Sequence, residues 1–267
     1  MWKNNRRVLV TGGGTFLGDY IAAALLAEGA DVSMLVRPGN EEHLGALGQR
    51  VRWWVADVWD PASLRGRGRG QSVVVHTVGS LVANPQQGLT HHRLNFLSAR
   101  NVANMCITDG VPRMVLMSSA RAPWISGAYI KAKREAETYM ARVGLDGYTV
   151  RAPITYLRGQ KRPLLYRIVS ALGNTPIISW LGFRRIAPLP IDIIARGVAR
   201  IALEPQPHKR VYYAGDLVRL NTRDERRNVP APVPHTNGQP YQVAHPFQLL
   251  DDDAPFAWLP PDSEENT

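Results

Sequence analysis

Short apolar runs alternate with longer helical segments through the first 150 residues of the chain. The runs have the length and apolar content of buried strands, and they cover residues 7–11, 31–36, 51–55, 72–76, 113–117 and 147–150. The helical segments between them cover residues 16–28, 89–108 and 127–142, with a short helix expected from about residue 61. Strand–helix–strand repetition is typical of a parallel sheet covered on both faces. The sequence therefore predicts an α/β, doubly wound Rossmann-type fold.

The pattern loosens after Pro153. We expect a helix over 163–172, an apolar stretch over 174–183, a helix over 191–203 and a last strand over 211–214. Asp192 is placed to cap the helix over 191–203. These features divide the chain into a dinucleotide-binding core (1–153), a small substrate-side lobe interleaved with it (154–215) and an irregular tail (216–267). The tail is rich in proline without long periodicity, so we expect it to be extended or partly disordered.

The net charge of +10 is unevenly distributed along the chain. Residues 216–267 carry nine acidic and four basic side chains, a net charge of −5, so the rest of the chain carries +15. Such asymmetry suggests either a tail that folds back on a basic body or a separate partner for each, including a protein complex docked through the tail. The Arg-Gly run at 65–70 resembles an RNA-binding segment, but its position favours a basic connecting loop. We expect no specific nucleic-acid partner.

Metal and membrane signals are weak. Cys106 is the single cysteine, which excludes an intramolecular disulfide and a cysteine-based zinc site. His76, His91 and His92 lack the spacing of metal ligands, and we expect them at the surface or at helix ends. No secretory signal or apolar run of membrane-spanning length is evident, which favours a cytoplasmic protein. Trp180, beside two arginines, leaves peripheral contact with a membrane as an alternative.

A glycine-rich loop, Thr-Gly-Gly-Gly-Thr-Phe-Leu-Gly, joins the first predicted strand to the first helix. Glycines let the backbone turn sharply and approach phosphates, and the helix N-terminus offers free N–H groups and a positive dipole. The motif follows the first strand of an alternating pattern, which favours a dinucleotide site over a plain turn. The candidate cofactor-binding residues in this loop are Gly12, Gly14, Thr15, Phe16, Leu17 and Gly18.

Two further positions point to the adenosine half of a dinucleotide. Arg37 follows the second strand, where an acidic residue favours NAD and an arginine accommodates the 2′-phosphate of NADP. We therefore expect NADP(H) rather than NAD(H), with a solvent-facing Arg37 as the alternative. Asp57, with Val58 beside it, follows the third strand and is a candidate for contact with the adenine amino group. The alternative for Asp57 is a cap for the helix expected near residue 61.

Tyr129 and Lys133 are four residues apart in a predicted helix and therefore share a face. A free tyrosine has a pKa near ~10, and a nearby ammonium group lowers that pKa by favouring the phenolate. Such a pair makes a usable general acid/base for a carbonyl or an alcohol. The preceding strand ends in Ser118 and Ser119, whose hydroxyls could hold the substrate oxygen.

Together these motifs resemble the short-chain dehydrogenase/reductase superfamily, in the extended or atypical branch that includes sugar-nucleotide epimerases and hydroxysteroid and flavonol reductases. The resemblance covers roughly residues 7–215. It rests on the glycine loop, Asp57, the Val-Val-Val-His run at 73–76, the Tyr129/Lys133 pair and the Pro-Ile-Asp run at 190–192. It also rests on residues 95–101, 115–119 and 151–153.

The resemblance implies a role for each candidate residue. Tyr129 would donate the proton, Lys133 would bind the nicotinamide ribose and tune Tyr129, and Ser119 or Ser118 would orient the carbonyl. Cofactor contacts would come from Thr77, Val78, Gly79, Pro153 and Ile154. The implied activity is an NADP(H)-dependent oxidoreductase or epimerase acting on a carbonyl or alcohol substrate that the sequence does not identify.

Three departures from the family pattern support an alternative. Thr15 stands where the loop usually has its middle glycine, the interval from Ser119 to Tyr129 is short, and the substrate lobe is small. This combination is similar to atypical members that bind NADP(H) without evident turnover, such as the nucleotide-binding accessory subunit of respiratory complex I. The alternative is therefore a non-catalytic, cofactor-stabilised subunit of a larger, membrane-associated complex.

Overall fold

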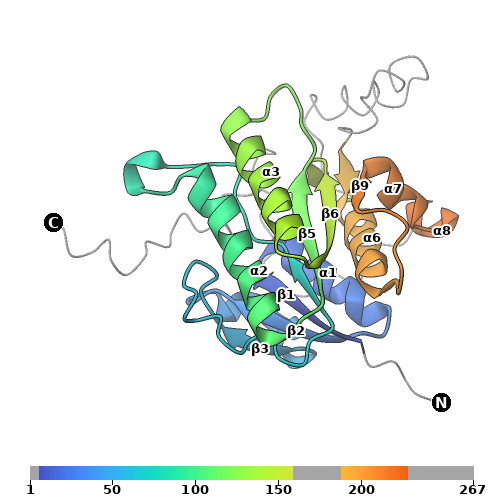
Figure 1. Cartoon of the computed structure of the whole chain (residues 1–267). Helices are drawn as coiled ribbons and strands as arrows, with labels where there is room; N and C mark the ends of the chain where they lie inside the picture. The colour runs from blue at the N-terminus through green and yellow to red at the C-terminus, as the bar shows by residue number, and fades with distance from the viewer. Residues whose placement is uncertain (1–5, 159–187, 228–267) are drawn as a thin grey trace.

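The computed structural model describes residues 6–158 and 188–227. Its centre is a seven-stranded sheet in the order β3-β2-β1-β4-β5-β6-β9, and each neighbouring pair is parallel (Figure 1). The strands are β1 (Arg7–Gly13), β2 (Asp31–Val36), β3 (Arg52–Val55), β4 (Val73–His76), β5 (Arg113–Ser119), β6 (Asp146–Ala152) and β9 (Val211–Tyr213). A separate parallel pair joins β7 (Thr155–Tyr156) to β8 (Leu189–Pro190). The predicted parallel sheet is confirmed.

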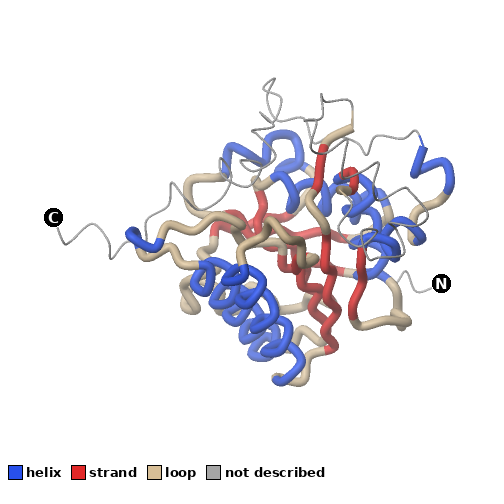
Figure 2. Tube along the Cα trace, turned by 90° about the horizontal axis from the view of Figure 1, so that it is seen from above, coloured by secondary structure: helices blue, strands red, loops and turns tan. Residues whose placement is uncertain are grey.

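Helices cover both faces of the sheet, as Figure 2 shows from above. On one face, α1 (Phe16–Ala27) and α6 (Ile191–Leu203) pack on the sheet and on each other. On the other face, α2 (Ser98–Asp109) and α3 (Gly127–Arg142) pack over a second apolar cluster, which includes the buried Cys106. Both α1 and α6 are apolar around most of their circumference, which suits helices buried between a sheet and neighbouring elements.

The strand order reverses direction at β1, because the chain runs outward through β2 and β3 and then returns to β4 on the other side. In open α/β sheets a crevice forms at such a switch point, outside the carboxyl ends of the strands, and ligands bind there. The glycine loop follows β1 and the segment beginning at Thr77 follows β4, so the fold brings both candidate cofactor segments to this crevice.

Three local predictions were wrong. Residues 61–70 form turns rather than a helix, because Gly66 and Gly70 adopt positive φ values of 73° and 74°. The long helix does not begin at Leu89, whose backbone pairs with Asn84; a π-helical turn, η3 (His92–Leu97), precedes α2 instead. Asp192 does not cap α6, because Pro190 occupies the N-cap position and the Asp192 carboxylate faces two arginines.

The first part of the expected extended tail is helical. The last strand ends at Tyr213, and two short helices follow it, α7 (Ala214–Arg219) and α8 (Arg223–Arg227). The expected helix over 163–172, the apolar stretch over 174–183 with Trp180, and the tail from residue 228 lie outside the described residues. The division of the chain into three domains remains a prediction.

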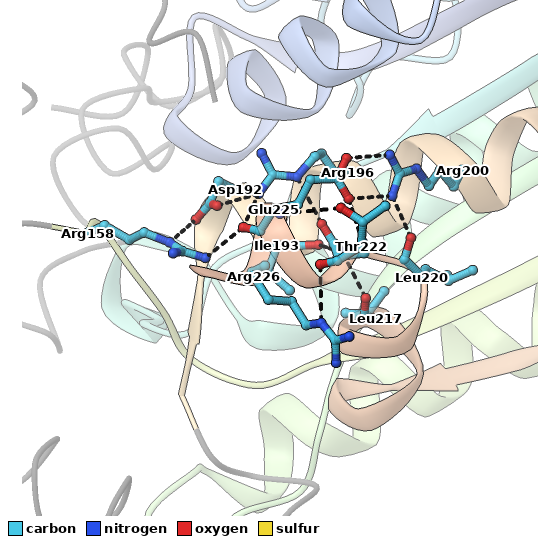
Figure 3. Close-up of polar contacts among 11 residues, drawn as sticks. Arg158, Asp192, Ile193, Arg196, Arg200, Leu217, Leu220, Thr222, Glu225 and Arg226 are labelled. Carbon is cyan, nitrogen blue, oxygen red and sulfur yellow. Dashed lines mark hydrogen bonds and ion pairs between the residues drawn. The ribbon is translucent and has the colours of Figure 1, made fainter. Parts of the chain in front are cut away.

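A partly buried polar cluster fastens α8 to α6 (Figure 3). Arg200 of α6 holds both carboxylate oxygens of Glu225, at 2.6 and 2.9 Å. The Glu225 carbonyl accepts a hydrogen bond from Arg196 at 3.2 Å, and Arg196 also pairs with Asp192 at 2.5 Å. Arg158 completes the cluster through Asp192 at 3.1 Å. Arg200 therefore holds α8 through the carboxylate of Glu225.

This cluster predicts an acid-dependent contribution to stability. The Arg200 guanidinium lowers the pKa of Glu225 from its ordinary 4.5 to about 2, so the stabilisation is complete above pH 4.5 and is lost as the pH falls toward 2. We expect Glu225→Gln to lower the urea midpoint at pH 6, and the difference from wild type to narrow below pH 4.5. Asp224→Asn, on the same helix, is the control. A difference that stays constant from pH 6 to pH 3 would contradict this account.

Candidate functional site

The glycine loop closes tightly at the start of α1. Gly12 and Gly14 have φ values of 80° and 75°, a conformation that glycine adopts without strain. Thr15 is the N-cap of α1: its hydroxyl donates to the Gly12 carbonyl at 2.6 Å and accepts from the Gly18 N–H at 3.3 Å. Thr15 therefore replaces the family's middle glycine with a side chain that ties the loop together.

Close approach explains the last glycine of the motif. A Cβ atom on Gly18 would lie 2.1 Å from the Gly12 carbonyl oxygen, well inside contact distance. Next to it, the side chains of Phe16 and Leu17 pack into the apolar cluster under α1. Within the described structure these two residues thus have core contacts, and their predicted contact with a cofactor remains a prediction.

A buried acid that no sequence motif marked lies beneath the loop. Asp19, in the first turn of α1, has no exposed surface, and its carboxylate accepts the Gly14 N–H at 2.9 Å. An acid in the first turn of a helix is favoured by the helix dipole, and this was the available sequence signal. Because Asp19 already holds one of the loop amides, a bound pyrophosphate would be met by the others.

A pocket beside the loop brings together five predicted residues: Gly12, Thr15, Arg37, Val58 and Val78. Its walls are completed by Gly13, Leu35, Asn40, Ala56 and Trp59. The sequence analysis did not single out Asn40 or Trp59, which come from loops after β2 and β3. A mainly apolar pocket with an aromatic side chain and an arginine at its edge fits the adenosine half of a dinucleotide.

Arg37 and Asp57 differ in their fit to this pocket. Arg37 lines it and donates to the Asn40 side-chain oxygen at 2.8 Å. The Asp57 carboxylate accepts the Trp59 N–H at 2.8 Å, and burial raises its pKa. Asp57 thus shapes the turn that carries Trp59, and its predicted contact with adenine remains a prediction. The helix-cap alternative fails because no helix forms at residue 61.

The segment after β4 runs along the loop toward the catalytic candidates. The Thr77 N–H donates to the Thr11 hydroxyl at 3.2 Å, and the Thr77 hydroxyl donates to the Thr11 carbonyl. A Cβ atom on Gly79 would lie 2.6 Å from Lys133 Nζ and 2.5 Å from Asn95 Oδ1. Gly79 thus lets the backbone pass against the lysine that the family pattern assigns to the nicotinamide ribose.

Ser119, Tyr129 and Lys133 meet at the carboxyl end of β5. All three are buried, with exposed fractions of 7%, 8% and 4%. Lys133 Nζ lies 5.8 Å from the centre of the Tyr129 ring and donates to the Met117 carbonyl at 3.2 Å. The structure therefore brings together the three residues that the sequence singled out as catalytic.

The predicted direction of the Tyr129 pKa is wrong for this structure. Burial raises the pKa of Tyr129 to about 12, although the neighbouring Ser119 hydroxyl and the charge of Arg134 oppose the shift. Burial also lowers the pKa of Lys133 to about 8. Tyr129 is thus a protonated hydroxyl at neutral pH, which suits the donation of a proton.

The structure distinguishes among the serines. The Ser119 hydroxyl donates to the Ala120 carbonyl at 3.1 Å and is close enough to Tyr129 to lower its pKa, whereas the Ser118 hydroxyl donates to Glu137 at 2.6 Å. Ser126 is the N-cap position of α3 and makes no side-chain capping bond. Of these serines, Ser119 is the one that acts on Tyr129, and its predicted role in orienting a substrate oxygen remains a prediction.

Pro153 and Ile154 follow β6 directly. The last residue of β6, Ala152, pairs with Ser119, which places Pro153 and Ile154 beyond the same carboxyl edge of the sheet as the candidate catalytic serine. The Ile154 carbonyl accepts the Leu189 N–H at 3.1 Å and so joins the β7–β8 pair. Their predicted contact with the nicotinamide remains a prediction.

One histidine, His76, was misjudged from the sequence. His76 is fully buried rather than at the surface: its Nδ1 lies 2.9 Å from the Thr11 hydroxyl, and burial lowers its pKa to about 3. His91 does lie at the start of η3, but its ring meets the Tyr129 ring edge-on at 5.8 Å. No group of three His, Cys, Asp or Glu residues in the described ranges could hold a metal ion, and no helix there is long and apolar enough to span a membrane.

The fold and the site define a nucleotide-binding protein, and comparison with known proteins gives its family. A family model described as NAD(P)H-binding matches residues 12–172, more than half of the chain. The chain therefore belongs to this NAD(P)H-binding family, within the extended short-chain dehydrogenase/reductase and epimerase-like proteins.

Two of the curated relatives are named as a reductase and a dehydrogenase. The chain is 29% identical over 201 residues to ceramide reductase of Caulobacter vibrioides, covering 74% of this chain and 61% of that protein. It is 30% identical over 145 residues to the bovine (Bos taurus) sterol-4-alpha-carboxylate 3-dehydrogenase, decarboxylating, covering 54% of this chain and 38% of the relative. The chain thus spans less than two thirds of the length of either relative.

Solved structures share the fold at low identity. UDP-glucose 4-epimerase of Thermus thermophilus, in complex with NAD, has a TM-score of 0.56 at 19% identity, covering 80% of this chain and 82% of that one. Vestitone reductase of alfalfa (Medicago sativa) has a TM-score of 0.54 at 19% identity, covering 78% and 76%. At this identity the likeness shows the Rossmann-type fold.

Proposed function

We propose that the protein is an NADP(H)-dependent oxidoreductase that interconverts a carbonyl and an alcohol. The observation that carries this proposal is the meeting of Ser119, Tyr129 and Lys133 in one buried site beside Gly79. Ser119 ends β5, and Tyr129 and Lys133 lie on successive turns of α3. They meet at the carboxyl edge of the sheet, beside the candidate cofactor segments. The names of the curated relatives support the same class of reaction.

The residues divide the chemistry among themselves. When bound, the nicotinamide supplies the hydride for the carbonyl carbon. Ser119 orients the substrate oxygen by a hydrogen bond, and Tyr129 gives that oxygen its proton in the direction of reduction. Lys133 supplies a positive charge that stabilises the phenolate left on Tyr129. In the direction of alcohol oxidation the same groups act in reverse.

The choice of NADP(H) over NAD(H) rests on Arg37. Arg37 lines the pocket proposed for the adenosine half, and none of the described residues that line this pocket is acidic. We expect Arg37→Gln to weaken NADPH binding by about tenfold to a hundredfold, since a charged hydrogen bond contributes about 1.5–3 kcal/mol, and to leave NADH binding unchanged. Fluorescence titration of the nicotinamide measures both. Equal losses for the two cofactors would contradict this assignment.

A transfer experiment tests the proposed reaction. The protein is incubated with NADPH deuterated at C4 and a panel of aldehydes and ketones, including ketones built on sterol and ceramide skeletons. We expect one deuterium in the product alcohol, detected by mass spectrometry. Bound NADPH without transfer to any member of the panel, in wild type and Tyr129→Phe alike, would contradict the proposal and favour the accessory-subunit alternative.

A further inference from the structure

A charged cluster lies behind the candidate catalytic residues, between α3 and the ends of β5 and β6. We call it the Glu137 cluster: Ser118, Arg134, Glu137, Arg151 and Tyr213. The Glu137 carboxylate accepts from Ser118 at 2.6 Å and from Arg151 Nη2 at 2.6 Å, and it forms an ion pair with Arg134. Arg151 Nη1 donates to the Tyr213 hydroxyl at 2.6 Å.

Burial distinguishes this cluster from ordinary surface ion pairs. The side chain of Glu137 is 11% exposed, and those of Arg134 and Arg151 are 29% and 23% exposed. One carboxylate therefore balances two largely buried guanidinium groups. Loss of one partner of such a pair is costly because it leaves a buried charge uncompensated.

The cluster connects the two halves of the proposed site. On the strand side, Arg134 Nη2 donates to the Ser119 carbonyl at 2.9 Å and so fixes the backbone of the candidate catalytic serine. On the helix side, Glu137 follows Lys133 by four residues and lies one turn along α3 from it. Glu137 is the negatively charged residue whose field acts on Lys133, and it raises the lysine pKa against the effect of burial.

Among residues 6–158 and 188–227, the other groups that face Lys133 bring no negative charge. The Met117 carbonyl of β5 accepts its hydrogen bond, and Tyr129 of the same helix presents its ring. His76 of β4 also faces Lys133, and burial together with the charge of the lysine lowers the pKa of the histidine. Gly79, in the loop after β4, lies between Lys133 and Asn95 of η3. Glu137 is thus the described group whose charge favours the ammonium form of Lys133 against the effect of burial.

We infer that Glu137 is a positioning residue of this site: its carboxylate keeps Lys133 charged and, through Arg134, fixes Ser119 relative to Tyr129. This inference rests on the proposed function, in which the charged Lys133 supports Tyr129. Glu137 itself is placed to act through its neighbours and forms no contact with Tyr129 among the described interactions.

The test is a titration of Lys133 in the full chain without cofactor. Lysines are labelled with ¹³C at Cε, the Lys133 signal is assigned with Lys133→Arg, and its chemical shift is followed from pH 6 to pH 11. Glu137→Gln should move the midpoint to a lower pH by half a unit or more. Glu137→Asp keeps the negative charge on a side chain that is shorter by one methylene, and it should shift the midpoint of the Lys133 titration less. Glu135→Gln, a more exposed acid of the same helix, should leave it unchanged.

A second readout links the cluster to the cofactor. In Glu137→Gln, the alkaline pH at which NADPH affinity falls should also move to a lower value. The reason is that Lys133 loses its charged ammonium group at a lower pH in this variant. A Lys133 midpoint that is the same in wild type, Glu137→Asp and Glu137→Gln would overturn the inference. Because the Lys133 titration needs no cofactor, failure of NADPH to bind would count against the proposed function alone.

Discussion

Gly18→Ala should abolish cofactor binding and destabilise the fold. The added methyl group would lie 2.1 Å from the Gly12 carbonyl and 3.1 Å from the Thr15 hydroxyl, both part of the loop proposed to hold the pyrophosphate. The nearest atom is backbone, so the start of α1 must move away from the loop. Overpacking of this kind lowers the free energy of unfolding by about 1–3 kcal/mol. The affinity of the distorted loop for NADPH should fall by about a hundredfold or more. Urea unfolding and a fluorescence titration measure the two effects.

Gly127→Ala is the matched control. Gly127 is the first residue of α3, and a Cβ atom there meets nothing within 4 Å. Since alanine is the better helix former by roughly 0.8–1.0 kcal/mol, this variant should bind NADPH normally and unfold at the same or slightly higher urea concentration. Equal NADPH affinity in Gly18→Ala and Gly127→Ala would show that the loop is not where the cofactor binds.

Tyr129→Phe should remove turnover and leave NADPH binding intact. The ring and its contacts with His91 and Lys133 are kept, so only the hydroxyl beside Ser119 is lost. General acid catalysis contributes typically about 10²–10⁴-fold, and kcat should fall by that factor. The measurement is the rate of deuteride transfer at saturating NADPH, with the cofactor dissociation constant determined separately.

The pH dependence gives this prediction a second test. With its pKa raised to about 12, Tyr129 stays protonated through neutral pH, so carbonyl reduction should not fall on the alkaline side until other groups titrate. Tyr139→Phe is the control, because Tyr139 lies far along the same helix, α3, from Tyr129. Its hydroxyl donates to the side chain of Asn104 on α2 at 2.6 Å. A Tyr129→Phe variant as active as Tyr139→Phe would contradict the role of Tyr129 as proton donor.

The sheet, the glycine loop and the Tyr129/Lys133 pair could be predicted because each depends on local pattern. Alternating strands and helices admit few topologies, and those topologies bring the ends of β1, β4 and β5 to one edge. The i, i+4 spacing of Tyr129 and Lys133 fixes their common face without knowledge of the rest of the fold.

What the sequence could not provide depends on distant partners. Asp192 has the position of a helix cap, but Arg158 and Arg196 take its carboxylate instead. The spacing of Tyr129 and Lys133 predicts a lowered tyrosine pKa, whereas burial raises it. Asn40 and Trp59 line the pocket proposed for the adenosine half from irregular loops, where no periodicity marks them.

The most direct measurement is a calorimetric titration of the purified wild-type protein with NADPH and with NADH. The account predicts one NADPH bound per chain, about tenfold or more tighter than NADH, because Arg37 recognises the 2′-phosphate. Equal affinities would contradict the role of Arg37 and leave the site as one for either dinucleotide. If neither cofactor binds, the central claim that this chain uses its glycine loop to hold NADP(H) beside Tyr129 is wrong.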